Sequence, residues 1–231
     1  MKYQFYSWED IMHPHLIVML THNDCTVENA AAVFERYKDS KAQFWGFKEK
    51  NLPLDKMKHL FTYMKSLGKT TVLEVVDYDE AGGLRGAKLA LDCGCDILMG
   101  TRYYDSIHGY CRTHGIKYMP FIGQVTKRPS VLTGSIEGII AEGKAYLSKG
   151  VYGLNLLGYR YEGEAEVLIK RLVASLEAPI CIAGSIDTYE KLSFLKEVQP
   201  WGFTIGSAFF EGKFGGDFGE QINKVCDFMQ H

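Results

Sequence analysis

The chain has 231 residues, of which 46% are apolar and 23% charged, and its formal net charge is −2. This length suits a single α/β barrel of about 250 residues. With a near-neutral net charge, the chain lacks the excess of Lys and Arg that is typical of proteins that bind nucleic acids or anionic membranes. No apolar run approaches the length of a membrane span or the core of a signal peptide, so we expect a cytoplasmic protein without nucleic-acid or membrane partners.

Short apolar runs alternate eight times with longer segments of helical periodicity. Strands are expected at residues 16–20, 43–47, 71–76, 97–100, 117–122, 151–157, 179–183 and 202–205. Helices are expected near residues 26–38, 54–67, 80–93, 104–114, 135–149, 163–176, 187–197 and 217–229. A short helix over residues 7–15 is expected to close the N-terminal end. Repeated βα units of this size predict a single (β/α)8 TIM barrel over residues 1–231.

A doubly wound open sheet is the alternative architecture. Its glycine-rich loop follows the first strand, whereas here the first expected strand leads into residues 21–24, which contain no glycine. The sequence therefore favours the barrel.

Two neighbouring segments near the C-terminus each combine a short apolar run, a Gly-Ser pair and a helical pattern. The pairs are Gly184-Ser185 and Gly206-Ser207. Small residues let an anion approach the main chain, and helix N-termini carry partial positive charge. Because barrels of this class commonly bind phosphate after the seventh and eighth strands, the two pairs predict a phosphate site.

Catalytic candidates lie at the carboxyl ends of the expected strands, where barrel active sites are built. Glu74 interrupts an apolar strand, and burying a carboxylate is costly unless it is paired. If Glu74 faces the lumen, Lys48 on the neighbouring strand can reach it, and the pair can transfer a proton next to a carbonyl, with Asp77 as a further acid or base. The alternatives are a structural salt bridge or a helix-facing side chain for Glu74, a solvated loop or a Schiff-base amine for Lys48, and helix capping for Asp77.

Other polar side chains follow the remaining strands. Residues 22–24 follow the first strand, and the candidates for substrate binding are Arg102, Gln124, Asn155 and Arg160. Residues 123–130 carry two cations beside a proline, and we expect either a lid over an anionic substrate or a solvated loop.

No metal or cofactor is predicted. Cys93 and Cys95 are separated by one residue, which is not the spacing of a zinc or redox motif, and we expect reduced thiols. His13, His15 and His22 have no further ligand at a defined spacing. The sequence also contains no dinucleotide fingerprint or P-loop.

Residues 159–163, 179–186 and 205–214 resemble the histidine-biosynthesis branch of the ribulose-phosphate-binding barrels. In that branch the seventh strand ends in a Gly-Gly pair, and the eighth runs into a Gly-x-Ala-x-x-Glu-Gly-Lys-Phe segment, matched here by residues 206–214. The resemblance implies that the two Gly-Ser pairs hold a phosphate. It does not extend to the reaction, because Ser185 replaces the second glycine and the acids of the first and fifth strands are missing.

The sequence pattern of residues 77–101 is similar to that of the amino-sugar-phosphate 2-epimerases. At the seventh strand, however, residues 183–185 stand in place of the Glu-Gly-Arg of those enzymes. The Asp-x-Lys-x-x-Asp signature of the related decarboxylases and hexulose-phosphate synthases is absent after Asp77. Residues 151–157 contain no lysine of the kind that keto-acid phosphate aldolases use. The resemblance thus implies the superfamily and leaves its member open.

We expect an enzyme that binds a phosphorylated sugar or sugar acid and isomerises or epimerises it by acid–base chemistry. One alternative is aldolase-type cleavage of a carbon–carbon bond, with Lys48 as the imine-forming amine. The other is a barrel that binds a phosphorylated ligand without catalysis. The expected partner is a small phosphorylated metabolite, and a homo-oligomer is compatible with the composition.

Overall fold

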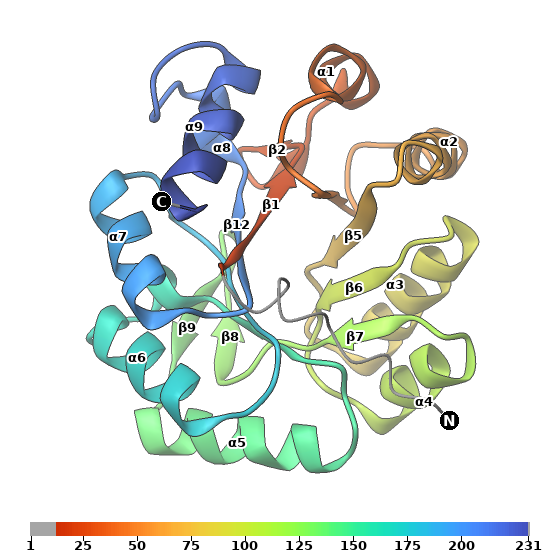
Figure 1. Ribbon diagram of the computed structural model, residues 1–231. Coiled ribbons are helices and arrows are strands. Elements are labelled where there is room, and N and C mark those ends of the chain that lie inside the picture. The colour runs from red at the N-terminus through yellow and green to blue at the C-terminus, as the bar shows by residue number, and fades with distance from the viewer. Residues whose placement is uncertain (1–12, 231) are drawn as a thin grey trace.

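The computed structural model describes residues 13–230, so the helix expected over residues 7–15 lies largely outside the described residues. Within them, eight strands form one parallel sheet, in the order β10 (Leu154–Leu156), β11 (Ile180–Ile182), β12 (Gly202–Ile205), β1 (His15–Met19), β4 (Phe44–Lys48), β5 (Thr70–Val75), β6 (Ile97–Gly100) and β7 (Lys117–Met119). The two ends of this sheet meet at a parallel bridge between Phe121 and Asn155. The barrel is therefore nearly closed, and the predicted (β/α)8 fold is confirmed (Figure 1).

Helices surround the strands on the outside of the barrel (Figure 1). They are α1 (Ala30–Tyr37), α2 (Leu54–Ser66), α3 (Glu80–Asp92), α4 (Asp105–Thr113), α5 (Ile136–Ser148), α6 (Ala165–Ser175), α7 (Tyr189–Val198) and α9 (Phe218–Gln230). Four begin at a side chain that accepts a hydrogen bond from the N–H group three residues later, and these caps are Asp79, Ser135, Thr188 and Asp217. The helix expected from residue 26 begins later because a short strand occupies residues 25–26.

The barrel strands are buried on both faces. Helices cover the outer face, and a second apolar cluster fills the lumen, made of Ile17, Met19, Val72, Ile97, Met99, Met119 and Cys181. Burial on both faces explains why most of these strands read as continuous apolar runs without alternation.

Between residues 13 and 230, two small hairpins and two short helical turns interrupt the regular pattern. The hairpins pair β2 (Thr21–His22) with β3 (Cys25–Thr26) and β8 (Gln124–Thr126) with β9 (Val131–Thr133). The turns are the 3₁₀ helix η2 (Gly158–Arg160) and α8 (Ser207–Phe210). The segment expected as a lid or solvated loop thus contains a folded hairpin, whose inward residues Val125 and Leu132 are fully buried.

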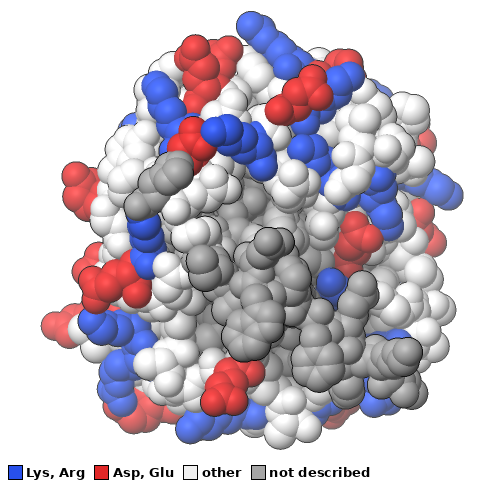
Figure 2. Space-filling view, in the orientation of Figure 1, with Lys and Arg blue, Asp and Glu red and all other residues white. Residues whose placement is uncertain are grey.

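The charged surface is mixed. On the face shown in Figure 2, described Lys and Arg side chains are interspersed with Asp and Glu around the edge of the molecule. Among the described residues, no helix combines the length and apolar character needed to cross a membrane.

Candidate active site

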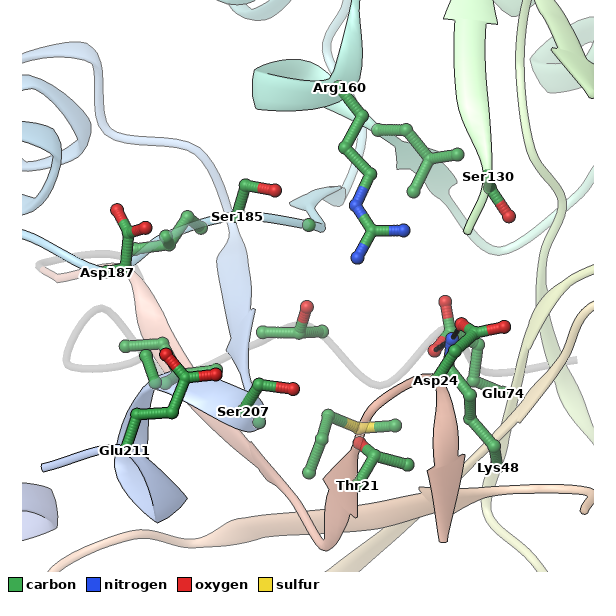
Figure 3. A pocket seen from close by; sticks show the side chains of 18 residues that line it. Thr21, Asp24, Lys48, Glu74, Ser130, Arg160, Ser185, Asp187, Ser207 and Glu211 are labelled. Atoms are coloured by element: carbon green, nitrogen blue, oxygen red, sulfur yellow. Dashed lines mark hydrogen bonds and ion pairs between the residues drawn. The ribbon is translucent and has the colours of Figure 1, made fainter. Parts of the chain in front are cut away.

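A cavity of about 250 Å³ lies at the carboxyl ends of the barrel strands. This is below the roughly 300–1,000 Å³ typical of sites for drug-sized ligands, so the cavity suits a small molecule. Its polar lining comprises Thr21, Asp24, Lys48, Glu74, Ser130, Arg160, Ser185, Asp187, Thr204, Ser207 and Glu211. In Figure 3, Asp24, Lys48 and Glu74 gather on one side, and Ser185, Asp187, Ser207 and Glu211 lie on the other.

Glu74 faces the lumen. It lies two residues after Val72 on β5, and Val72 belongs to the apolar cluster that fills the barrel. Lys48 is the register partner of Glu74 on β4, and the Lys48 Nζ lies 3.5 Å from Glu74 Oε2. The Nζ also donates a hydrogen bond to Asp24, in the turn between β2 and β3. One ammonium is therefore shared by two carboxylates.

The Lys48 ammonium is stabilised in its charged form. Burial by itself would lower the pKa of this group, but the nearby Glu74 carboxylate and the hydrogen bond to Asp24 outweigh that effect, so the pKa is raised above its ordinary value. The Lys48 side chain is therefore a cation and a hydrogen-bond donor at neutral pH.

Arg128 ties the β8–β9 hairpin to Asp24 and to a further carboxylate, that of Glu49. Its guanidinium donates a hydrogen bond of 2.8 Å to Glu49 and another to the Val76 carbonyl, and it lies 3.7 Å from Asp24 Oδ2. The Tyr78 hydroxyl donates to the Lys127 carbonyl at 2.7 Å. The hairpin is thus fixed against the strand ends, with Ser130 in the cavity wall.

Arg160 is the cation that faces the cavity without a partner. It belongs to η2, and no described residue forms a hydrogen bond or ion pair with its guanidinium, which extends into the cavity in Figure 3. A side chain on Gly184 would place its Cβ 2.9 Å from Arg160 Nε, so the glycine leaves room for the arginine to cross this turn. Both Gly184 (φ 83°) and Ser185 (φ 58°) are in the left-handed region.

The two Gly-Ser turns lie against the same cavity. Gly184 and Ser185 follow β11, whereas Gly206 follows β12 and Ser207 begins α8. α8 is a single turn of four residues, and its Phe209 N–H already donates to the Gly206 carbonyl at 3.0 Å.

Two further carboxylates at this end already have cationic partners. Lys191 Nζ lies 2.7 Å from Asp187 Oδ1 and also donates a 2.7 Å hydrogen bond to the Ser185 carbonyl. Glu211 Oε2 lies 3.6 Å from Lys213 Nζ. Because Asp187 and Glu211 contact these lysines, neither of them forms an ion pair with Arg160 in the described residues.

Four predicted site residues do not line this cavity. Asp77 lies in the loop after β5 and packs over Gly82 at the start of α3. Arg102 donates to the Val125 carbonyl at 3.0 Å and lies over the Tyr78 ring. The remaining two are the exposed Gln124 on β8 and the fully buried Asn155 on β10.

The sequence-based set omits several residues of the cavity wall. Asp24 belongs to the polar run after the first strand, and Asp187 lies two residues after the Gly184-Ser185 turn. Ser130 carries no local signal, because the β8–β9 hairpin brings it to the cavity.

Metal-binding and redox motifs were not expected. In the described part of the chain, no three His, Cys, Asp or Glu side chains are grouped in a way that suits a metal ion. The cysteines are free thiols, and burial raises the pKa of Cys93 to about 11 and that of Cys111 to about 12. These two thiols are thus poorly ionised at neutral pH.

No protein-family model matches this chain, and neither does any curated protein. Among solved structures, it is similar to a native KDPGal structure at 14% identity and a TM-score of 0.67, over 99% of this chain and 97% of that one. It is also similar to an N-acetylmannosamine-6-phosphate 2-epimerase from Clostridium perfringens at 13% identity and a TM-score of 0.63, over 90% of this chain and 93% of that one. An orotidine 5′-phosphate decarboxylase from Pyrococcus horikoshii OT3 is similar at 11% identity and a TM-score of 0.68, over 94% of this chain and 99% of that one. At such identities, the likeness establishes a shared barrel fold over almost the whole chain.

Proposed function

We propose that this protein is an enzyme that isomerises or epimerises a small phosphorylated sugar or sugar acid by acid–base catalysis. One observation carries the proposal: a buried lysine ammonium, shared by Asp24 and Glu74, lines the same small cavity as the unpaired guanidinium of Arg160. The first group can polarise a carbonyl, and the second can hold an anion.

The phosphate is assigned to the Arg160 side of the cavity. An unpaired guanidinium provides charge and paired donors for a phosphate, and the Gly184 and Gly206 turns let it approach the main chain. The resemblance of residues 205–214 to a phosphate-binding segment supports the same placement. Two similar structures are named for enzymes of phosphorylated compounds, N-acetylmannosamine-6-phosphate and orotidine 5′-phosphate.

The proton transfer is assigned to Lys48 and Glu74. The Lys48 ammonium donates a hydrogen bond to the substrate carbonyl oxygen while the Glu74 carboxylate removes a proton from the adjacent carbon. The C–H electron pair forms an enolate, whose oxygen the ammonium stabilises. Return of the proton to the former carbonyl carbon, with transfer of the neighbouring hydroxyl proton to the enolate oxygen, completes an isomerisation. Return to the original carbon on its opposite face gives the epimer.

The protonation of Lys48 favours this chemistry over aldolase-type cleavage through an imine. Attack on a carbonyl requires a neutral amine, and enzymes that use one lower its pKa. Here the two carboxylates raise the pKa of Lys48 instead. The largely buried charged groups Asp24, Lys48 and Glu74 converge on one cavity, and removing such charges from water costs free energy. Such clusters are common in active sites, so the arrangement supports an enzyme over a non-catalytic barrel.

A thermal-shift series tests the anion site. Inorganic phosphate and a panel of sugar phosphates are expected to stabilise the wild type, by about 2.7 kcal/mol at a hundredfold excess over Kd. Arg160→Met removes the cation and Ser207→Asp adds a carboxylate at the start of α8, so both are expected to reduce the shift. Arg171→Met, which loses only an exposed ion pair with Glu137, is the control. Equal shifts in all four proteins would contradict the assigned site.

A trapping experiment tests the choice of chemistry. Sodium borohydride added in the presence of the sugar phosphates reduces any imine to a stable amine. We expect no adduct on Lys48. A reduced adduct on that residue would contradict acid–base catalysis by its ammonium and support the imine mechanism.

A further inference from the structure

Asp24 occupies a backbone position that favours glycine. The β2–β3 hairpin has the two-residue turn Asn23-Asp24, because its last register pair joins His22 to Cys25. Both turn residues have a positive φ, 49° for Asn23 and 64° for Asp24. Turns with two positive φ values strongly favour Asn-Gly, and a side chain at the second position is strained. The presence of Asp24 there indicates that its carboxylate has a role beyond forming the turn.

The β2–β3 hairpin holds Lys48 at two points. Thr26 Oγ1 on β3 donates to the Lys48 carbonyl at 2.7 Å and accepts from the Lys48 N–H at 3.0 Å. At the far end of the side chain, Lys48 Nζ donates to Asp24 Oδ1. The backbone and the ammonium of Lys48 are therefore both fixed by the same short hairpin.

The second oxygen of Asp24 faces the other hairpin. Arg128 Nη1 on the β8–β9 hairpin lies 3.7 Å from Asp24 Oδ2, and Arg128 also donates to Glu49 at 2.8 Å. The Asp24 side chain is only 14% exposed. Each of its oxygens thus faces a different cation, and the carboxylate is held from both sides.

Glu74 contacts the same ammonium less closely. Its Oε2 lies 3.5 Å from Lys48 Nζ, which is longer than the roughly 2.7–3.2 Å of an N–H···O hydrogen bond. In the proposed reaction Glu74 takes up a proton, and a neutral carboxyl group no longer balances the buried ammonium. Since an unpaired buried charge is costly, Lys48 needs a second carboxylate that stays ionised during this step.

We propose that Asp24 is a positioning residue that holds the Lys48 ammonium charged and directed at the substrate carbonyl while Glu74 gains and loses the proton. This inference rests on the proposed function and separates the roles of its two carboxylates. An ammonium has three N–H groups. Asp24 binds one of them, which leaves the other two for Glu74 and the carbonyl oxygen. Asp24 itself takes no proton from the substrate, because both of its oxygens already face cations.

The charged groups around Lys48 determine what removal of Asp24 does. Burial lowers the pKa of the Lys48 ammonium, and the Arg160 guanidinium on η2 lowers it further. Glu74 on β5 and Asp24 in the β2–β3 turn raise this pKa and outweigh both effects. Arg128 faces Asp24 from the β8–β9 hairpin. Without the Asp24 charge, Glu74 alone opposes burial and the nearby guanidinium groups, so the pKa of Lys48 must fall.

The first test follows the titration of Lys48 directly. Lysine is labelled with 13C at Cε, the Lys48 signal is assigned by its absence from Lys48→Met, and the pKa is measured by NMR. Asp24→Asn removes the charge but keeps a side chain that tolerates a positive φ, and we expect the pKa of Lys48 to fall by at least about one unit. An unchanged titration would overturn the inference.

Two further turn variants show that the effect comes from the carboxylate and not from the fold. Asp24→Gly supplies the residue that the turn favours, so the hairpin should form, and we expect the same fall in the pKa of Lys48. Asn23→Gly changes the other, exposed turn residue and should leave the titration as in the wild type. A fall of equal size in Asn23→Gly would assign the effect to the turn backbone and overturn the inference.

The second test measures deuterium exchange into sugar phosphates as a function of pH. Asp24→Asn should bind inorganic phosphate as the wild type does and have an at least about tenfold lower maximal rate. The alkaline limit of its rate should move to lower pH, which a purely structural role would not cause. Asp24→Glu restores the charge and should move this limit back toward the wild-type pH.

The inference and the proposed function fail in different ways. If the wild type exchanges no proton of any sugar phosphate, the proposed function is removed and this inference with it. If the wild type exchanges and Asp24→Asn has the same rate and pH profile, only the role of Asp24 is overturned.

Discussion

The Lys48 Nζ lies 3.5 Å from Glu74 Oε2 on the neighbouring strand, and both side chains are only about one-tenth exposed. Such a pair is costly to remove from water. In this barrel it stands at the carboxyl ends of the strands and borders an open cavity. The arrangement therefore places a hydrogen-bond donor and a proton acceptor where a substrate can reach both.

Lys48 contacts two carboxylates, whereas Glu74 contacts only one ammonium among the described residues. Substitutions of the two residues should therefore reduce stability by different amounts. Lys48→Met leaves the Asp24 and Glu74 carboxylates without their shared ammonium and should reduce the free energy of unfolding by about 3 kcal/mol or more. Glu74→Gln leaves Lys48 paired with Asp24 and should cost clearly less. Urea unfolding at neutral pH measures both, and a larger loss for Glu74→Gln would contradict the described network.

The pH dependence of this stabilisation follows from the raised pKa of Lys48, whose ordinary value is 10.5. A group with a raised pKa in the folded state stabilises the protein fully below its unfolded pKa and loses this effect as the pH rises through the folded value. The difference in unfolding free energy between wild type and Lys48→Met should thus stay constant up to about pH 10. Its disappearance by about pH 9 would show that the lysine is neutral there.

Arg128 should hold the β8–β9 hairpin against the site. Arg128→Met removes hydrogen bonds to Glu49 and the Val76 carbonyl, and we expect faster hydrogen exchange in residues 124–133 and a loss of about 1 kcal/mol in stability. Lys127→Met is a matched control, since that exposed side chain forms only a 3.8 Å pair with Glu162. If both variants exchange at the wild-type rate, the hairpin is held by its apolar contacts instead.

The stabilisation from the hydrogen bonds of Lys65 and Thr71 to Asp96 should be lost in acid. Burial alone would raise the pKa of its carboxyl group, but hydrogen bonds from Lys65 and Thr71 outweigh this, and the pKa is lowered from 3.8. Its stabilisation is therefore present above the unfolded pKa and lost as the pH falls through the lower folded value. Asp96→Asn should lower stability by about 1–3 kcal/mol at neutral pH, and the difference from wild type should shrink below about pH 4. A difference that grows in acid would contradict this.

The sequence was sufficient for the barrel because its strands are buried on both faces and its helices carry local caps such as Asp79 and Ser135. It also singled out Glu74, since a carboxylate within an apolar strand stands out. The sequence alone does not give the direction of that side chain, which follows from the position of Val72 in the lumen.

The rest of the site depends on contacts between distant segments. β8 and β9 have three residues each, too few for a reliable alternating pattern, so the position of Ser130 had no local signal. Arg102 follows its strand as a substrate-binding residue would, but the β8–β9 hairpin supplies the Val125 carbonyl that binds it. Asn155 likewise looks like a strand-end residue in the sequence, and only the barrel register places it below the cavity.

The most direct measurement is proton exchange with solvent. Sugar phosphates are incubated with the protein in D2O, and deuterium on the carbon next to the carbonyl is followed by NMR. We expect deuterium incorporation with the wild type, and at least about a hundredfold slower incorporation with Glu74→Gln. With Arg160→Met, we expect a higher sugar-phosphate concentration to be needed for the half-maximal rate. Incorporation by Glu74→Gln at the wild-type rate would contradict the assignment of Glu74 as the base. No incorporation from any sugar phosphate that binds the wild type would contradict proton transfer at this site.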